Sequence, residues 1–381
     1  MENRIYLDYA ATTPLCDQAR EAMYRCLKEI SGNASGVYQT AREAKRCLEE
    51  ARAKAARSMN AYPDEIYFTS GGSESDNWAL KGIAFKAGTG SHIVTTMIEH
   101  PAVMNTCRFL EKCGYTVTYV QPDSHGRIDP EDIRKALRPE TALISVMWAN
   151  NEIGTVEPIR EIAAVAREAG IPFHTDAVQA IGTLPVDVHS MGIDLLSLSA
   201  HKFYGPKGIG ILYLRRGLAI EPLIHGGEQE RGLRASTENV AAAMGLSAAL
   251  EAADLQRENE YARLRALRDH LYSLLKEALP DIRINGSIGN RLSGNLHLTI
   301  PETDDKTLIP LLDLNGVEAS AGSACTAGSY VESHVLKAIG VPNELLRGSL
   351  RLTLGRGTTE QDIEEASGRI IDTVKSLRSS H

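Results

Sequence analysis

The stretch Ser199-Ala200-His201-Lys202-Phe203-Tyr204-Gly205-Pro206-Lys207-Gly208 decides how this chain folds. It follows the apolar run 193–198 and opens into turns that are rich in glycine and proline. We interpret the apolar run as a buried strand, with Lys202 just beyond its end. In α/β proteins, ligands bind at this end of the strands. A lysine shielded from water there can lose its proton and become a nucleophile toward an aldehyde.

Strand-like runs on both sides of this stretch alternate with amphipathic helices, such as residues 74–86 and 159–169. Such alternation predicts an α/β domain in which helices cover a mostly parallel sheet. The seven predicted strands of this sheet are residues 65–70, 92–97, 116–120, 142–148, 172–176, 195–199 and 210–214.

A long helical stretch over residues 238–279 leads into a C-terminal part with a mixed α+β pattern. We expect a large α/β domain over residues 15–260, and a smaller α+β domain formed by residues 1–14 and 261–381. Thr358-Thr359-Glu360 offers a threonine N-cap for a last helix. The other predicted elements are strands at 281–285, 294–299, 317–320 and 349–354 and a helix at 305–314.

Composition excludes several classes of protein. The chain has 381 residues, 43% hydrophobic and 24% charged, as is usual for globular proteins. Its net charge of −8 and scattered basic residues give no reason to expect nucleic-acid binding. No apolar run approaches the roughly 18 residues of a membrane span, and the N-terminus lacks the apolar core of a signal peptide. We therefore expect a cytoplasmic protein.

The six cysteines show no CxxC pair and no zinc-finger spacing, so we expect no catalytic metal. Cys325 differs from the others because it lies in the small-residue stretch 319–329, where a thiol would be accessible. The remaining five lie in helix-like segments and are expected to be small buried hydrophobic residues: Cys16, Cys26, Cys47, Cys107 and Cys113.

Pyridoxal phosphate, PLP, is a cofactor built around a lysine Schiff base, and Lys202 is the candidate lysine. The pyridine nitrogen of PLP stays protonated only beside a carboxylate. Asp176 ends the strand at 172–176 and can supply it, and Gln179 can reach the ring hydroxyl. His100 follows the strand at 92–97, where an imidazole can stack on the ring and move a proton.

The phosphate of that cofactor needs a cradle of backbone N–H groups. The sequence Gly71-Gly72-Ser73-Glu74 follows a predicted strand and opens a helix, whose N-terminus favours an anion. Gly72 and Ser73 are the best candidate contacts. Ser199 and His201 are further candidates.

Two segments can recognise an amino-acid substrate. Asn150-Asn151-Glu152 follows the strand at 142–148, and a short amide there can bind the cofactor ring hydroxyl or the substrate carboxylate. Arg351 alternates with apolar residues in a predicted strand, and a guanidinium matches a carboxylate with two hydrogen bonds. Arg356 is an alternative. A mobile Cys325 thiol could take sulfur from a bound substrate as a persulfide, a reversible cysteine state.

With this set in view, the chain resembles the cysteine desulfurases, the NifS/IscS-like group of enzymes with the class V aminotransferase fold. The resemblance runs from Tyr6-Leu-Asp-Tyr-Ala-Ala-Thr-Thr-Pro14 to Leu354-Gly-Arg-Gly-Thr-Thr-Glu360. It is carried above all by 199–208, by Asn150-Asn-Glu-Ile-Gly154 and by Gly322-Ser-Ala-Cys-Thr326. It implies the PLP-dependent transferase fold, similar to that of aspartate aminotransferase.

The resemblance also implies roles for individual residues. Lys202 corresponds to the Schiff-base lysine, Asp176 to the pyridinium partner, His100 to the stacking base and Cys325 to the persulfide carrier. Arg351 corresponds to the substrate carboxylate clamp, and Asn151 to a contact of the cofactor ring and substrate. The other implied cofactor ligands are Gly72, Ser73, Gln179, Ser199, His201 and Thr237.

Thr237 corresponds to a phosphate contact that reaches in from the neighbouring subunit, so the resemblance implies a homodimer. The Cys325 loop has the longer, group I form rather than the short form ending in His-His-Cys. Family members that dock an iron–sulfur scaffold protein carry a longer tail than Ser379-Ser380-His381, which leaves the sulfur acceptor open. An iron–sulfur cluster could also be bound transiently by Cys325.

The implied activity is removal of sulfur from L-cysteine, giving L-alanine and a persulfide on Cys325. The persulfide would pass to an acceptor protein, for iron–sulfur cluster assembly, cofactor sulfuration or tRNA thiolation. Two alternatives stay open at this point. One is another reaction on the same fold, such as that of a selenocysteine lyase or a transaminase. The other is a sulfur-transfer scaffold without catalysis.

Overall fold

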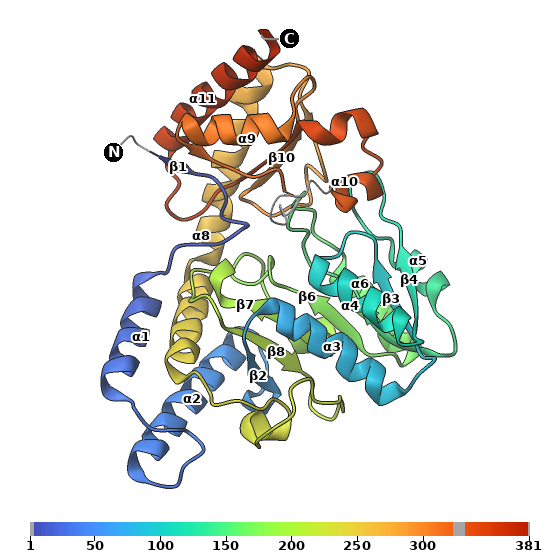
Figure 1. The fold of residues 1–381 in the computed structure, drawn as a ribbon, viewed down its shortest axis with the longest axis vertical. Helices are drawn as coiled ribbons and strands as arrows, with labels where there is room; N and C mark the ends of the chain where they lie inside the picture. The colour runs from blue at the N-terminus through green and yellow to red at the C-terminus, as the bar shows by residue number, and fades with distance from the viewer. Residues whose placement is uncertain (1–3, 323–331, 380–381) are drawn as a thin grey trace.

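The structure, a computed structural model, describes residues 4–322 and 332–379. Its largest element is a seven-stranded sheet with the strand order β2-β8-β7-β6-β5-β3-β4 (Figure 1). Neighbouring strands from β7 to β4 run parallel, whereas β8 is antiparallel to both β7 and β2. The strands are β2 (Ile66–Thr69), β3 (His92–Thr96), β4 (Thr116–Val120), β5 (Thr141–Ser145), β6 (Phe173–Asp176), β7 (Leu195–Ser199) and β8 (Gly210–Leu214).

The prediction of a mostly parallel seven-stranded sheet is therefore confirmed, with one difference in a strand's length. The strand expected over residues 142–148 is β5, which ends at Ser145. Beyond it, Val146 and Trp148 still hydrogen-bond the backbone of β6, at His174 O (3.1 Å) and Asp176 O (2.9 Å). The chain thus leaves regular strand geometry early but stays beside the sheet until the Asn150 turn.

Helices cover both faces of this sheet because its strands bury adjacent residues on opposite sides. Leu195 belongs to a core that includes Trp78 of α3 and Val103 of α4. Leu196, its neighbour, belongs to a core shared with α2, α6 and the first half of α8. The helices of this part are α1 (Asp17–Glu29), α2 (Gln39–Ser58), α3 (Gly72–Ala87), α4 (Pro101–Lys112), α5 (Pro130–Ala136), α6 (Ile159–Ala169), α7 (Val188–Met191) and α8 (Val240–Ala278).

A second core lies in the C-terminal part of the molecule, around an antiparallel sheet with the order β12-β10-β9. Helix α8 runs through both parts, and its Leu271 and Leu275 belong to this second core (Figure 1). The remaining elements are β9 (Arg283–Ile284), β10 (Asn295–Thr299), α9 (Asp305–Leu314), β11 (Val317–Glu318), α10 (His334–Ala338), β12 (Ser349–Thr353) and α11 (Glu360–Ser379).

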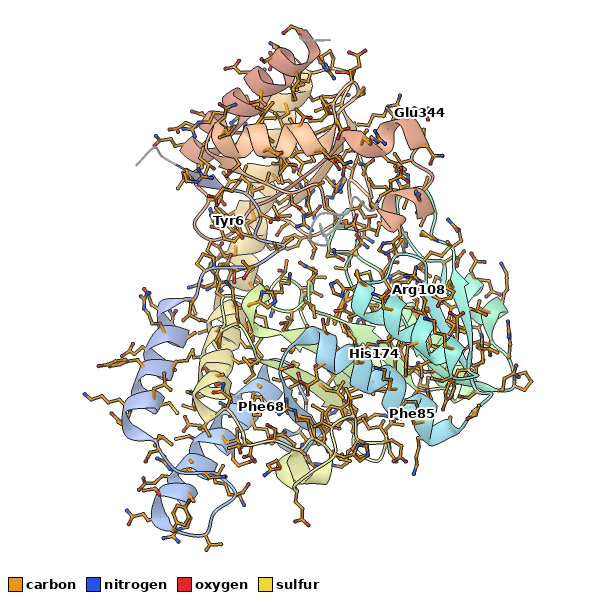
Figure 2. All side chains as sticks on the ribbon, viewed as in Figure 1. Tyr6, Phe68, Phe85, Arg108, His174 and Glu344 are labelled. Carbon is orange, nitrogen blue, oxygen red and sulfur yellow. The ribbon has the colours of Figure 1, made fainter. Side chains whose placement is uncertain are left out.

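The N-terminal strand β1 (Ile5–Tyr6) pairs in parallel with β11, so the start of the chain lies with its C-terminal elements. Figure 2 shows Tyr6 beside those elements, away from His174 in the large sheet. From β1 the chain returns toward the large sheet, where Thr13 N donates to His201 O at 2.9 Å. This path brings residues 8–13 next to Lys202.

Local capping agrees with the sequence signals. Asp362 N donates to Thr359 Oγ1 at 3.1 Å, and Thr359 N donates to Asp362 Oδ2 at 2.8 Å. This reciprocal pair is a capping box at the start of α11. Pro101 occupies the first turn of α4, as expected for a residue without a backbone N–H.

The expectation for the five helix-segment cysteines holds for three of them. Cys26, Cys47 and Cys107 are buried in helices. Cys16 is only partly buried because it precedes α1, and Cys113 is exposed because it follows the last turn of α4. Among the described residues, no helix is both long and apolar enough to cross a lipid bilayer.

Candidate active site

A cavity of about 970 Å³ lies at the carboxyl edge of the large sheet and extends to the C-terminal part. This volume is at the upper end of the usual range for small-molecule sites. Ten residues singled out from the sequence line it together: Gly72, Ser73, His100, Asn151, Asp176, Gln179, Ser199, His201, Lys202 and Arg351. The tertiary fold thus brings together side chains that are up to 279 positions apart in the chain (351 − 72).

Lys202 lies in a short 3₁₀ turn, Ala200–Lys202, directly after β7. Its Nζ donates hydrogen bonds to the backbone oxygens of Ala10 (2.5 Å) and Ala11 (2.8 Å). Burial, with the nearby Arg351 guanidinium, lowers the pKa of Lys202 to about 8. A sizeable share of this amine is therefore neutral slightly above neutral pH, as a nucleophile or base requires.

Asp176 is the last residue of β6 and is only 5% exposed. Its Oδ1 accepts a hydrogen bond from Val178 N at 2.9 Å. Burial raises the pKa of this carboxyl, and the nearby His100 and Lys202 counteract the rise. A carboxylate in this setting gains stability from any cation that enters the cavity.

His100 caps the N-terminus of α4, and its Nδ1 accepts a hydrogen bond from Ala102 N at 3.1 Å. The neutral ring therefore carries its proton on Nε2. Burial has the largest influence on the pKa of His100 and lowers it, whereas the nearby Asp176 raises it. The histidine is thus a neutral donor beside the cavity.

The glycine turn before α3 lies where the sequence predicts a phosphate cradle. Gly71, which caps the helix, has φ of +152°, a conformation that side-chain-bearing residues rarely adopt. A Cβ on Gly72 would lie 2.6 Å from Val178 Cγ2, so the first helical turn packs tightly on the loop after β6. The free N–H groups of this turn, together with the lining residues Ser73 and Ser199, suit an anion.

Two further predicted contacts hydrogen-bond the N-terminal segment. Gln179 Nε2 donates to Ala10 O at 3.1 Å. His201 Nδ1 lies 3.2 Å from Thr12 Oγ1, and burial lowers the pKa of this ring to about 4. His201 is therefore neutral at physiological pH and offers hydrogen bonds rather than charge.

The structure distinguishes the two asparagines that the sequence left open. The side chain of Asn150 is buried and shapes the turn: it donates to Ile98 O and accepts from Glu152 N, both at 2.9 Å. Asn151, in contrast, lines the cavity. Asn150 is thus structural, and Asn151 is the residue that a ligand can reach.

The two candidate arginines are also separated. Arg351 lines the large cavity and makes an ion pair with Asp8, Nη2 to Oδ1, at 2.8 Å. Its Nη1 donates to Asn151 O at 2.9 Å. Arg356 instead lines a smaller neighbouring cavity, and its guanidinium is 4.3 Å from the centre of the Tyr204 ring. Arg351 is therefore the arginine available to a ligand in the large cavity.

Several lining residues were not singled out from the sequence. Asp8, Ala10 and Ala11 come from the N-terminal segment, and Asp76 comes from the second turn of α3. The carbonyl oxygens of the two alanines contact Lys202, which no side-chain pattern could reveal. Asp76 carried no such signal either, because exposed or half-buried polar residues stand on both sides of it in the same helix: Ser73, Glu74 and Asn77.

One predicted site residue is not among the described residues that line the cavity. Thr237 is exposed, in the segment between the 3₁₀ turn Gln229–Gly232 and α8. Cys325 lies outside the described residues. The last described residues before it, Ala319, Ser320, Ala321 and Gly322, line the cavity.

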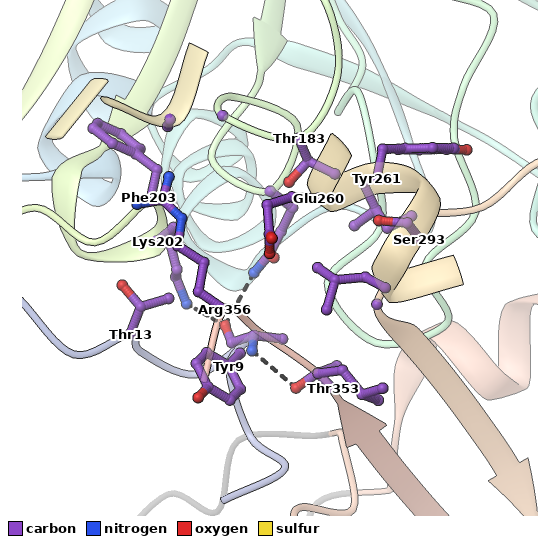
Figure 3. Close-up of a pocket in the computed structure, with 18 of the residues that line it drawn as sticks. Tyr9, Thr13, Thr183, Lys202, Phe203, Glu260, Tyr261, Ser293, Thr353 and Arg356 are labelled. Atoms are coloured by element: carbon purple, nitrogen blue, oxygen red, sulfur yellow. Dashed lines mark hydrogen bonds between the residues drawn. The ribbon is translucent and has the colours of Figure 1, made fainter. Parts of the chain in front are cut away.

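A smaller cavity of about 90 Å³ adjoins the same lysine (Figure 3). It shares Ala10, Gln179 and Lys202 with the large cavity. Ser293 Oγ and Asn295 Oδ1 are buried without a hydrogen-bond partner within residues 4–322 and 332–379, and both residues line this space. Buried polar atoms of this kind are usually satisfied by ordered water, for which the cavity has room.

Comparison with known proteins agrees with this geometry. The model of the Aminotransferase class-V family matches residues 5–365. The chain is 50% identical to the cysteine desulfurase IscS of Dictyoglomus turgidum over 381 residues, covering 99% of this chain and 97% of that protein. It is 48% identical to the cysteine desulfurase IscS of Methanosarcina thermophila, covering 99% and 94%.

Solved structures are also similar. One, a NifS-like protein, has a TM-score of 0.92 and 35% identity, covering 98% of this chain and all of that one. Another, SspA in complex with cysteine, has a TM-score of 0.81 and 39% identity, covering 92% and 98%. The chain belongs to the class-V aminotransferases, which are PLP-dependent enzymes. Within that family it is a cysteine desulfurase.

Proposed function

We propose that this enzyme takes sulfur from L-cysteine in the cavity around Lys202, with the site residues in the roles that the resemblance implies. The observation that carries the proposal is the convergence of Lys202, Asp176, His100 and Arg351 on one cavity. These four supply an attachment point, a partner for a pyridinium, a neutral donor and a carboxylate clamp.

The residues present fit PLP. Lys202 would hold its aldehyde carbon, Asp176 would pair with its ring nitrogen, and His100 would lie against its ring. The phosphate would be bound by the first turn of α3 with Ser199 and His201. The buried carboxyl of Asp176, which makes no ion pair among the described residues, supports this fit because a buried carboxylate favours a cationic partner. When bound, PLP withdraws electrons from the substrate's α-carbon.

The other steps belong to the chain's own residues. Arg351 binds the substrate carboxylate, and its ion pair with Asp8 keeps the guanidinium in place. Lys202, with its lowered pKa, accepts the proton from the α-carbon. His100 holds a proton on Nε2 and can pass it to a leaving or arriving group at the cavity.

The Cys325 thiolate attacks the sulfur of the substrate, and the carbon–sulfur bond breaks. Its electron pair stays on carbon, which takes up a proton. One cysteine and one protein thiol thus give one alanine and one protein persulfide, with no external oxidant or reductant.

The Cys325→Ser variant tests this assignment. It should bind PLP with the visible spectrum of the unmodified enzyme but form no protein persulfide when L-cysteine is added. Persulfide can be measured by mass spectrometry of the trapped protein. Persulfide at the normal rate in this variant would overturn the role of Cys325. Alanine release measured from cysteine and from selenocysteine would reveal a lyase that prefers selenium.

We also propose a homodimer in which Thr237 contacts the phosphate in the neighbouring subunit. Apolar side chains are exposed on and after α1: Tyr24 is 66% exposed, Leu27 71% and Val37 87%. Exposed apolar groups of this kind are typical of contact surfaces. The segment that carries Thr237 is held to α3 by a two-point ion pair between Arg234 and Glu74, at 2.8 and 3.1 Å.

Mixed dimers test this arrangement. A Lys202→Ala chain and a Thr237→Ala chain are co-expressed with different tags, and the mixed species is purified. If Thr237 serves the neighbour, the mixed dimer contains one site with both residues intact and binds PLP at that site with normal affinity. If Thr237 acted within its own chain, no intact site would form. A monomer in light scattering would also contradict the proposal.

The division into domains at residues 14/15 and 260/261 is supported by the separate core around β12-β10-β9, which is built from residues 5–7 and from residues beyond 260.

The persulfide is passed to an acceptor protein, for iron–sulfur cluster assembly or for thiolation. Transfer of ³⁵S from labelled Cys325 to candidate acceptors would identify it, and an enzyme that keeps its label with all of them would argue against transfer.

A further inference from the structure

Asp76 is a buried acid in the wall of the cavity that the proposed function leaves without a role. It lies in the second turn of α3 and is 1% exposed. A ligating atom of Asp76, one of Asp176 and one of His100 all lie within 4.8 Å of one another. Asp76 Oδ1 has no hydrogen-bond partner in the described part of the chain. Two carboxyl groups therefore lie side by side, with the His100 ring beside them.

The nearest histidine does not supply a positive charge. His174 Nε2 lies 3.7 Å from Asp76 Oδ1, but both ring nitrogens already face hydroxyl groups. Nδ1 is 2.8 Å from Ser145 Oγ, and Nε2 is 2.9 Å from Ser197 Oγ. Complete burial lowers the pKa of this ring to about 3, so it is neutral. Asp76 thus has no cation beside it on this side.

Two buried carboxylates this close cannot both stay ionised, so the pair holds one proton. Asp176 has the features that favour the charged form: the Val178 N–H bond and the nearby His100 and Lys202, which lower its pKa. The pKa of Asp76 is raised by burial and by the nearby Asp176 and Glu99. A hydrogen bond with Ser197 lowers it. The proton of the pair belongs on Asp76.

We propose that Asp76 is a positioning residue for the reaction: it remains a neutral carboxylic acid next to Asp176 and keeps the single negative charge of the pair on Asp176. This rests on the proposed function, in which Asp176 meets the ring nitrogen of PLP. If Asp76 were ionised, it would compete with Asp176 for the proton on that nitrogen. A neutral Asp76 offers an O–H group instead and leaves Asp176 as the only anion at that position.

Two substitutions separate a neutral role from a charged one. Asp76→Asn keeps a neutral, hydrogen-bonding side chain of the same shape, whereas Asp76→Leu removes the polar group. The measurement is the affinity of the cofactor-free protein for PLP, followed by absorbance between about pH 6 and about pH 9.

The Asn variant should bind PLP within about 3-fold of the unmodified protein, with the same pH profile. The Leu variant should bind at least about 10-fold more weakly, the loss expected when a hydrogen bond to a charged group is removed. Glu157→Gln is the matched control, because Glu157 is also a buried carboxyl with one oxygen that lacks a partner among the described residues, but it lines neither cavity. It should leave the affinity unchanged.

A second measurement protects the test if the Leu variant folds poorly. The infrared spectrum of the cofactor-free protein should contain a carboxylic-acid C=O band at neutral pH that is missing from Asp76→Asn. Absence of such a difference would overturn the proposal, as would an Asn variant that binds PLP as weakly as the Leu variant. Equal affinities for all three proteins would also overturn it.

These readouts do not depend on cysteine turnover. If Cys325→Ser still formed persulfide, the catalytic assignment would fail while the PLP affinities stood. If the Asp76 variants bound PLP alike, only the role of Asp76 would fail.

Discussion

Two buried groups of ionisable side chains, at different places around the same sheet, differ in how completely their charges are satisfied. Arg52 of α2 and Glu230 are 2% and 5% exposed and make two parallel hydrogen bonds of 2.8 Å. Glu230 also accepts from Phe68 N at 3.0 Å. At the cavity, Asp76 and Asp176 are equally buried, and Glu99 is buried nearby, but Asp76 Oδ1 and Glu99 Oε2 lack partners within the described residues.

The difference separates a structural role from a functional one. The Arg52–Glu230 pair holds a strained segment, since Glu230 and Arg231 both have positive φ, at 46° and 58°. Its charges satisfy each other and leave nothing for a ligand. The carboxyls at the cavity have strongly perturbed protonation equilibria and unsatisfied oxygens, which a bound cation or a proton can satisfy. At this cavity, incomplete satisfaction therefore occurs at residues that the proposed chemistry uses, whereas Glu157 Oε1 and Arg378 Nε are unsatisfied elsewhere among the described residues.

The largest expected effect comes from removing the cavity lysine. Lys202→Ala should lower turnover by at least about 1,000-fold, because it removes both the attachment point and the base. The visible absorbance of the bound cofactor should disappear. The free energy of unfolding should change by less than about 2 kcal/mol, since among the described residues Nζ hydrogen-bonds two backbone oxygens and otherwise faces the cavity. A variant that keeps the absorbance would place the attachment elsewhere.

Breaking the Arg52–Glu230 ion pair should lower stability and leave the cofactor site intact, the opposite of removing Lys202. Arg52→Ala should cost about 3–5 kcal/mol of stability in urea unfolding, because Glu230 is left buried without its cation. The cofactor spectrum of the remaining folded protein should be normal. The double variant Arg52→Met/Glu230→Met should recover much of the loss, since no charge is then left unpaired. A double variant as unstable as the single one would contradict this account.

The buried carboxyl of Glu99 should make the stability of the protein depend on pH. Burial raises the pKa of this carboxyl to about 8, so the folded protein binds a proton there that the unfolded chain releases above about pH 4.5. Stability from this group is thus full at low pH and falls as the pH rises from about 5 to 8. Glu157, with a pKa also raised by burial to about 8, acts in the same direction.

Glu99→Gln should reduce this slope by up to about 1.4 kcal/mol per pH unit, because glutamine does not titrate. Urea unfolding at pH 5, 6, 7 and about 8 measures it. An unchanged slope would mean that Glu99 is charged in the folded protein at neutral pH.

The smallest effect is expected at the exposed N-cap of α11, where the hydrogen bonds of Thr359 are complete. Thr359→Ala removes the cap of α11 and should cost about 1 kcal/mol in the same unfolding experiment. Activity and PLP affinity should not change, because the cap lies outside both cavities. Thr359→Ser, which keeps the hydroxyl, should recover most of the stability.

Much of the fold was predictable because its signals are local. Buried parallel strands appear as short apolar runs, and six of the seven predicted strands end within about one residue of the observed ends. The exception, β5, ends three residues before the predicted end (148 − 145), since an apolar run alone does not reveal where strand geometry stops. The exposure of Cys113 was missed for a related reason: the helix ends just before it, and its last turn faces solvent.

The candidate site was predictable where a side chain follows a strand of the large sheet. Lys202, Asp176 and His100 each end or follow such a strand, and parallel strands bring their carboxyl ends to one edge. The partners of Lys202 were not predictable. Ala10 and Ala11 act through backbone oxygens, and Asp8 reaches Arg351 from 343 positions away.

By itself, then, the sequence determined the sheet, the lysine at its edge and the set of side chains that a PLP enzyme needs, because strand periodicity and strand ends are local properties of the chain. Only the tertiary structure decided which groups are left unsatisfied. It buried Asp76 against Asp176, paired Arg351 with Asp8 and turned Asn150 into a structural residue. Burial and long-range contact set those outcomes, and neither is encoded within any one segment.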